Sequence, residues 1–232
     1  MAGIGSDDRP LAALLLFAAV AWPFYLNDFY LIALSGTSNI GLLWVLDVVF
    51  YFLIPSLTLY VLYRRGRLAH VRESLTQPPK LWFVVCMALA IANLTHIVFT
   101  RNITPWLNNN ICCRLCAPYA FPRGSLGLVT AVYASVSAGV LEEVIFRAHL
   151  MTLLERVLTP RIRADLHRKI AVVLAGCALF ALIHWCEGPG KLAATFLLGL
   201  LPAIIYMRSG NLWFPVLWHT MHDALAMGIV KI

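Results

Sequence analysis

Three charged side chains lie inside a strongly apolar segment of this sequence. Glu142, Glu143 and Arg147 fall within residues 125–154, which are otherwise mostly Leu, Val, Ala, Ile and Phe. A charged group at bilayer depth costs at least about 2.5–3.5 kcal/mol, so three together need a reason. The i, i+4 spacing lets Glu143 pair with Arg147 on one helical face. It leaves Glu142, about 100° around the helix, without a partner. Two carboxylates and a guanidinium at this depth indicate a functional site.

Further ionisable side chains occur in the later apolar segments. His219 and Asp223 are four residues apart and share a helical face, His222 lies one residue off that face, and His184 belongs to a separate segment. A single membrane histidine is more often a hydrogen-bonding contact between helices than a catalyst. Histidines and acidic residues on three helices instead favour one shared, water-accessible cavity.

The depths of these residues along their helices are predicted to agree. At about 1.5 Å per residue, Glu142 and His184 each lie roughly 20 Å from the cytoplasmic ends of their segments. Ser209, Gly210, Asn211 and Pro215 predict that the last helix starts near Pro215, after an extended segment. At about 3.3 Å per residue, that segment would carry the following histidines to a similar depth.

The composition indicates a membrane protein. The chain has 232 residues, of which 61% are hydrophobic and 12% charged, and its mean hydropathy is +0.80. Several apolar runs reach the length of a spanning helix. We therefore predict an all-α, polytopic membrane bundle of about seven transmembrane helices. The predicted spans are 11–34, 40–63, 81–99, 125–155, 170–186, 191–207 and 212–230.

The charge distribution predicts the orientation in the membrane. The net charge of +7 does not indicate nucleic-acid binding, because the basic residues lie between spans rather than on one soluble face. Most of them fall in segments 64–80 and 156–169, which places these segments and the N-terminus in the cytoplasm and the C-terminus outside. The small size and short loops favour a bacterial cytoplasmic membrane.

The polar residues resemble the motifs of a known family. Glu142-Glu143-x-x-x-Arg147, Phe180-x-x-x-His184 and His219-x-x-x-Asp223 are similar in order, type and separation to those of the CAAX-protease and bacteriocin-processing (CPBP, or Abi) family. This family includes the glutamic intramembrane endopeptidases related to the Rce1 CAAX prenyl protease. The resemblance covers about 125–230, so we expect a catalytic core in 125–232 and accessory helices with an external loop in 1–124.

The resemblance implies a role for each motif residue. Glu142 would be the general base that activates water, and His184 would help to hold that water. His219 and Asp223 would stabilise or orient the oxyanion side, while Glu143 and Arg147 would position the site. Rce1-like members carry Asn where Asp223 stands. An ionised Asp cannot donate a hydrogen bond, so this residue would be protonated or would orient His219.

The chemistry of the residues agrees with this expectation. Peptide hydrolysis needs a base for water and donors that face the developing oxyanion. A serine nucleophile elbow, a paired-Asp motif and an H-E-x-x-H motif are all missing from the sequence. We therefore expect an intramembrane endopeptidase that uses no cofactor and acts on a membrane-associated protein or peptide. Glu142, His184 and His219 could alternatively bind zinc. A proton-relay transporter and a non-enzymatic immunity protein are further alternatives.

The substrate and the cysteines are less constrained. Family members cleave prenylated CAAX tails, bacteriocin leaders or C-terminal sorting signals, and the last of these is preferred for this chain. Cys112, Cys113 and Cys116 lie in the predicted external loop, and Cys186 lies near the external end of its span. A disulfide there fits an oxidising compartment. The single Cys113-x-x-Cys116 pair is weak evidence for zinc.

Overall fold

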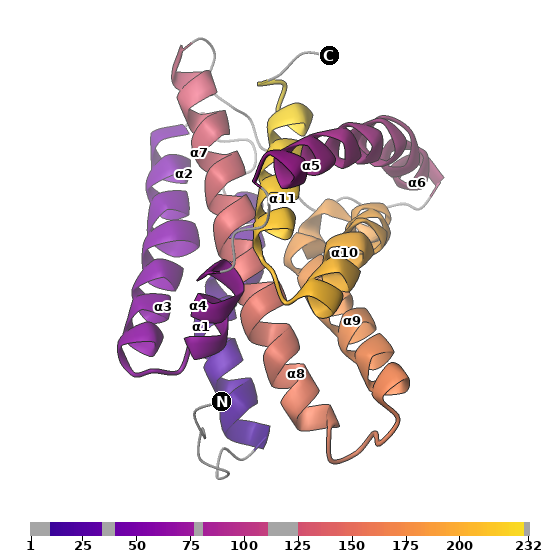
Figure 1. The fold of residues 1–232 in the computed structure, drawn as a ribbon. Helices are drawn as coiled ribbons and strands as arrows, with labels where there is room; N and C mark the ends of the chain where they lie inside the picture. Colours follow the sequence, from indigo (N-terminus) through magenta and orange to yellow (C-terminus); the bar gives the residue numbers. More distant parts are fainter. Residues whose placement is uncertain (1–9, 34–39, 77–80, 111–124, 230–232) are drawn as a thin grey trace.

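The computed structural model describes residues 10–33, 40–76, 81–110 and 125–229. Every regular element in these ranges is a helix (Figure 1), which confirms the predicted all-α class. The elements are α1 (Pro10–Ala33), α2 (Ile40–Leu46), η1 (Asp47–Leu53), α3 (Ile54–Arg64), α4 (Ala69–Thr76), α5 (Leu81–Thr95), η2 (His96–Ile103), α6 (Thr104–Asn110), α7 (Ser125–Glu142), η3 (Glu143–Leu150), α8 (Met151–Leu158), α9 (Asp165–Ala181), η4 (Leu182–Glu187), α10 (Pro189–Ser209) and α11 (Trp213–Ala226).

Five helical runs of the described residues are long and apolar enough to cross a bilayer. They are Gly41–Arg64, Phe83–Leu107, Ser125–Leu158, Asp165–Glu187 and Pro189–Ser209. The chain is therefore an integral membrane protein. The predicted count of seven spans is not confirmed: α11 has 14 residues, and the apolar stretch found in α1 is Leu14–Leu26.

The helix made by α7, η3 and α8 forms the centre of the molecule. Of the five apolar runs it is the most deeply packed, with 61% of its most apolar stretch buried, against 17% for Gly41–Arg64 and 22% for Phe83–Leu107. Phe146 of η3 makes edge-to-face contacts with aromatic rings of α1 and α9. The core around it fixes the helical turns that carry the acidic pair.

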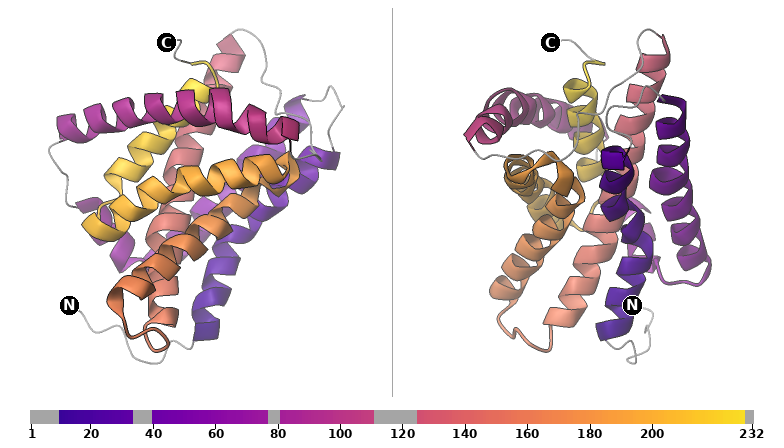
Figure 2. Two further views of the ribbon diagram at one scale, coloured as in Figure 1. Left: turned by 90° about the vertical axis from the view of Figure 1, so that its right-hand side faces the viewer. Right: turned by 180° about the vertical axis from the view of Figure 1, so that it is seen from behind.

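Two other helices cross this central helix instead of running beside it. The α5–α6 segment and α10 lie across the molecule at a steep angle to α7 (Figure 2). Because α10 is oblique, the connection from α10 to α11 lies about halfway up the bundle in Figure 1. Helix α11 therefore begins at mid-height.

The segment that leads into α11 differs from the sequence prediction. The helix begins at Trp213, two residues before Pro215, and Leu212 before it has φ −90° and ψ −14°, so the predicted extended segment is wrong. The connection is tied to α4, because the Leu212 N–H donates to the Ser74 carbonyl at 3.1 Å and the Trp213 indole donates to the Leu75 carbonyl at 3.0 Å. The oblique α10, and not extended backbone, brings α11 to its depth.

Helices α7 and α11 approach closely at Gly139. A Cβ added there would lie 2.1 Å from Thr220 Oγ1 and 2.7 Å from the Thr220 backbone nitrogen. Only glycine permits this separation, because the obstacle includes backbone. The close approach brings the end of α7 within side-chain reach of the polar residues of α11.

Candidate functional site

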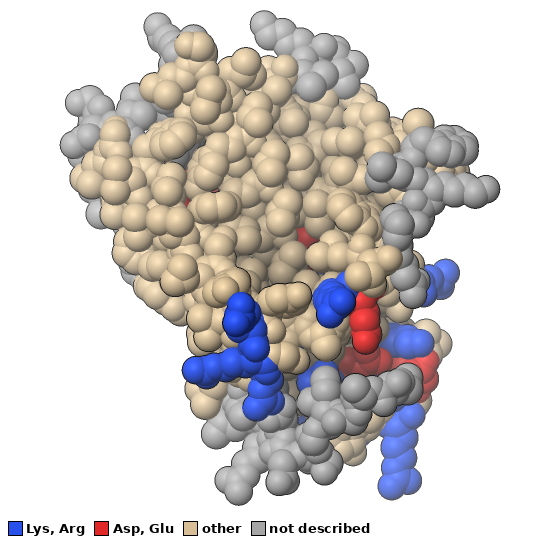
Figure 3. Space-filling model, turned by 60° about the vertical axis from the view of Figure 1, so that its left-hand side comes forward, with Lys and Arg blue, Asp and Glu red and all other residues tan. Residues whose placement is uncertain are grey.

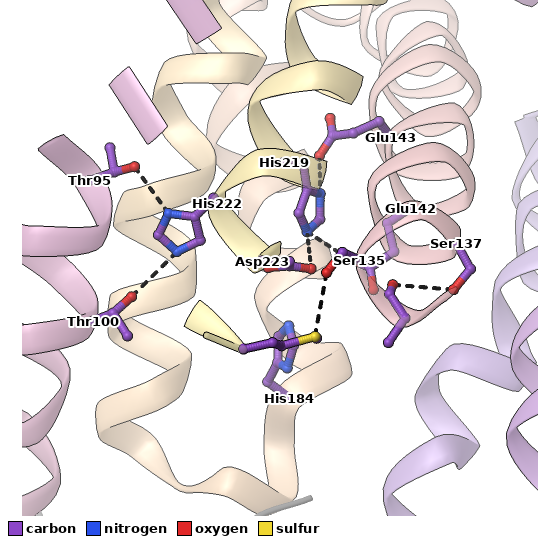
Figure 4. A network of polar contacts seen from close by, with 12 residues as sticks. Thr95, Thr100, Ser135, Ser137, Glu142, Glu143, His184, His219, His222 and Asp223 are labelled. Atoms are coloured by element: carbon purple, nitrogen blue, oxygen red, sulfur yellow. Dashed lines mark hydrogen bonds and ion pairs between the residues drawn. The ribbon is translucent and has the colours of Figure 1, made fainter. Parts of the chain in front are cut away.

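Glu142 and Glu143 lie at the junction where α7 becomes the π-helix η3. Their exposed fractions are 3% and 0%. The sequence predicted an ordinary α-helix here. The wider π turn changes the angular relation of neighbouring side chains, and π segments in α-helices are frequent at functional sites. Both carboxylates turn toward α11 (Figure 4).

The imidazole of His219 lies between the two carboxylates. Its Nδ1 is 2.9 Å from Glu143 Oε1, and its Nε2 is 3.7 Å from Glu142 Oε2. Asp223, one turn later on α11, places Oδ2 3.5 Å from the same Nε2. Glu142, which the helical spacing left without a partner, thus contacts the same histidine ring as Glu143.

Arg147 completes the buried charge network from within η3. Its Nε lies 3.3 Å from Glu143 Oε2, and both side chains are fully buried. The guanidinium also stacks over the Phe180 ring at 4.5 Å and donates to the Gly199 carbonyl at 3.5 Å. A Cβ on Gly199 would come within 3.1 Å of the guanidinium. The predicted i, i+4 pair is therefore present and held from three helical segments.

His184 reaches the site from η4, a 3-10 segment that continues α9. Its backbone, at φ −105° and ψ 27°, breaks the helix. Its Nδ1 is 2.9 Å from Glu187 Oε1. The Phe180 ring lies 6.2 Å from the His184 ring and 5.9 Å from the His219 ring.

Five of the six predicted site residues thus form one connected network of ion pairs. They are Glu142, Glu143, Arg147, His219 and Asp223. The sixth, His184, is linked to them through its neighbour Phe180.

Two residues at the site were missed by sequence reasoning. The Tyr51 hydroxyl, on η1, donates a hydrogen bond to Glu142 Oε1. Glu187 holds His184. A tyrosine in the middle of an apolar span was the available signal for the first, and a carboxylate three residues after a membrane histidine was the signal for the second.

His222 lies in a separate cluster on the other side of α11. The His222 nitrogens face two hydroxyls, with Nδ1 3.1 Å from Thr95 Oγ1 and Nε2 3.4 Å from Thr100 Oγ1. The ring stacks on Trp218 at 5.7 Å. This arrangement is that of a hydrogen-bonding contact between helices.

His149 has a similar packing role at another place. Its ring stacks on His70 of α4 at 5.7 Å with an interplanar angle of 13°. Burial, together with the positive charge of Arg156, lowers the pKa of His70 to about 4. His70 is therefore neutral near pH 7, and its ring joins α4 to η3 by stacking on His149.

The zinc alternative required Glu142, His184 and His219 to converge as ligands. Within the part of the chain that the structure describes, no group of three or more His, Cys, Asp or Glu side chains is arranged to hold a metal ion. That the site works without a metal ion stays a prediction. Cys112, Cys113 and Cys116 lie outside the described residues, while Cys186 is disulfide-bonded, as an oxidising environment allows.

The molecular surface agrees with a membrane setting. Figure 3 shows Lys and Arg side chains gathered near one end of the molecule, below a broad surface of uncharged residues. The segments that follow α3 and α8 lie at that end in Figure 1, as the basic residues of 64–80 and 156–169 predicted. The same face is hollowed, and an acidic side chain is visible at the base of the hollow.

These features define a class of protein: a helical membrane protein with a buried cluster of carboxylates and imidazole. The model of the family described as type II CAAX prenyl endopeptidase Rce1-like matches residues 124–225. This match confirms the resemblance to the Rce1-like family over residues 124–225. The family is a protease family, which supports a peptidase. Neither the curated proteins nor the solved structures contain a match.

Proposed function

We propose that this protein is a glutamic-type intramembrane endopeptidase in which Glu142 activates water. One observation carries the proposal. The His219 ring is held between two buried carboxylates, and Glu142 Oε2 accepts no hydrogen bond from the described residues. A buried carboxylate oxygen without a donor is suited to take a proton from water.

The geometry supports a reaction with balanced proton transfers. Water loses a proton to Glu142 Oε2, and its oxygen attacks the carbonyl carbon of the scissile bond. Glu143 accepts from the His219 Nδ1–H, which leaves Nε2 facing the site and able, when protonated, to donate to the oxyanion. Glu142 then returns its proton to the leaving nitrogen as the C–N bond breaks.

The other polar residues position this machinery. Glu187 holds Nδ1 of His184, so Nε2 is the nitrogen available to the water or the substrate. Asp223 acts on His219 Nε2 at 3.5 Å, which supports the orienting role considered from the sequence. Arg147 compensates the charge of Glu143. Buried charges require such compensation.

The proposed substrate is the C-terminal tail of a membrane-anchored protein. The matched family is described by its action as a CAAX prenyl endopeptidase. A prenylated tail and a hydrophobic C-terminal sorting signal share the same chemistry, a peptide bond beside an anchor in the bilayer. We favour the sorting signal, and a bacterial cytoplasmic membrane as its setting. Residues 1–124 would act as accessory helices.

The test uses purified protein in lipid nanodiscs and two fluorogenic probes. One probe is a farnesylated CAAX peptide, and the other carries a hydrophobic C-terminal tail. Cleavage of either probe by the wild type, and loss of cleavage in Glu142→Gln, would support the proposal and identify the tail. If the wild type cleaves neither probe, or if Glu142→Gln cleaves a probe as fast as the wild type, the proposal is contradicted. Activity lost with a chelator and restored by zinc would favour the metal alternative.

A further inference from the structure

Tyr51 brings the N-terminal half of the chain into contact with the proposed base. It lies on η1 (Asp47–Leu53), outside the family match at residues 124–225. Its hydroxyl donates to Glu142 Oε1. A site recognised only from the C-terminal motifs would therefore lack one of its contacts.

Aromatic packing holds the Tyr51 ring in place. The ring lies edge-to-face on Phe24 of α1, with centroids 4.6 Å apart. Phe24 is 1% exposed and in turn contacts Phe146 of η3 at 6.1 Å. The hydroxyl is thus directed by a chain of rings that ends four residues beyond Glu142.

The contact divides the two oxygens of Glu142 between different tasks. Oε1 accepts from Tyr51, whereas Oε2 faces His219 Nε2 at 3.7 Å and has no hydrogen-bond donor among the described residues. We propose that Tyr51 is a positioning residue for the general base: it fixes the carboxylate and leaves Oε2 for the water proton. This inference rests on the proposed function.

A second tyrosine of the N-terminal half offers a matched comparison. The Tyr25 hydroxyl, on α1, donates to the Leu179 carbonyl of α9 at 2.9 Å. It also joins the N-terminal half to the C-terminal half, but through backbone and not through a carboxylate. Tyr25→Phe therefore tests what loss of a purely structural link does.

The experiment compares Tyr51→Phe with Tyr25→Phe on whichever probe the wild type cleaves. Tyr51→Phe keeps the ring on Phe24 and removes only the donor. Hydrogen bonds to charged groups are strong, so kcat should fall about 10- to 100-fold while KM stays within about 2-fold. Tyr25→Phe should lower Tm and keep kcat within about 3-fold.

The pH profile separates positioning from structure. The groups facing Glu142 are Tyr51, His219, Asp223, His184 and Glu143. A carboxylate that loses a donor is ionised less readily, so the acidic limb of the kcat profile should move to higher pH in Tyr51→Phe. It should stay in place in Tyr25→Phe, whose hydroxyl does not contact the carboxylate.

The outcomes distinguish this inference from the proposed function. Wild-type kcat and pH profile in Tyr51→Phe would overturn the positioning role, as would the same pH shift in both tyrosine variants. If Glu142→Gln is inactive in the same assay, the proposed function survives that result. If Glu142→Gln keeps full activity, the assignment of the base fails and Tyr51 has no base to position.

Discussion

Two histidines on α11, three residues apart, have contrasting environments. His219 faces η3 and has ion-pair contacts with Glu142, Glu143 and Asp223 at 2.9–3.7 Å. His222 faces α5 and η2, and its two nitrogens meet the hydroxyls of Thr95 and Thr100. Both rings are buried, with exposed fractions of 8% and 7%, so depth does not separate them.

The partners decide what each histidine can do. Hydroxyls satisfy both nitrogens of His222, which suits a neutral contact between helices. Carboxylates surround His219, and its Nε2 stands 3.5 and 3.7 Å from two of them, beyond ordinary hydrogen-bond length. That nitrogen can therefore turn to a substrate or a water. The charged neighbours of His219, and not its depth, therefore support the catalytic role proposed for it.

Glu142→Gln should have the largest effect. The amide keeps an oxygen for Tyr51 but cannot take the water proton, so kcat should fall about 10²- to 10⁴-fold, the usual contribution of a general base. The measurement is probe cleavage in nanodiscs, with Tm as the control for folding. A fall of less than about 10-fold in a variant with wild-type Tm would remove the assigned base.

Replacing each histidine by glutamine sharpens the contrast on α11. His219→Gln should lower kcat about 10²-fold or more, because an oxyanion donor is lost. His222→Gln should lower the free energy of unfolding by about 1–3 kcal/mol, because a buried hydrogen-bonding network is weakened. Its kcat per folded molecule should stay within about 3-fold of the wild type. Equal losses of kcat in the two variants would contradict the division of roles.

Asp223→Asn should have an intermediate effect. The amide oxygen can still contact His219 Nε2, but the negative charge is gone, so kcat should fall measurably, by up to about 10-fold. The pH profile of kcat reports the change together with its size. Unchanged or higher activity would indicate that this position donates to the oxyanion, as an asparagine could, instead of orienting the histidine.

Thr95→Val should have the smallest effect. The substitution preserves shape and removes one hydroxyl facing His222, so stability should fall by about 0.5–1.5 kcal/mol with no change in kcat. Thermal unfolding in nanodiscs measures the first quantity and probe cleavage the second. A clear fall in kcat at unchanged stability would mean that the second cluster takes part in the reaction.

The sequence predicted pairs of residues within one helix better than it predicted the depth of a helix in the bundle. Residues four apart on a helix are neighbours, so the pairing of Glu143 with Arg147 and of His219 with Asp223 could be expected from spacing and is present. The depth of α11 could not be expected from the sequence, because it depends on the oblique path of α10 and on the hydrogen bond between α4 and Leu212. An extended segment was predicted in their place, and that was wrong.

The contact between Tyr51 and Glu142 shows the same limit. The residues are 91 positions apart, and no periodicity relates them. Their meeting depends on the packing of α1 and η1 against the central helix. The matched C-terminal motifs could therefore indicate the acidic pair, but not the tyrosine that reaches it.

The sequence by itself determined that this chain is a helical membrane protein and which ionisable residues need an explanation, because charges are costly in apolar segments. It also determined two pairs within helices, Glu143 with Arg147 and His219 with Asp223, since helical geometry makes residues four apart neighbours. Only the tertiary structure decided that His219 sits between two adjacent carboxylates, that His222 turns to neutral hydroxyls and that Tyr51 joins the site. These depend on the angles at which helices cross, which are set by packing such as the close approach at Gly139.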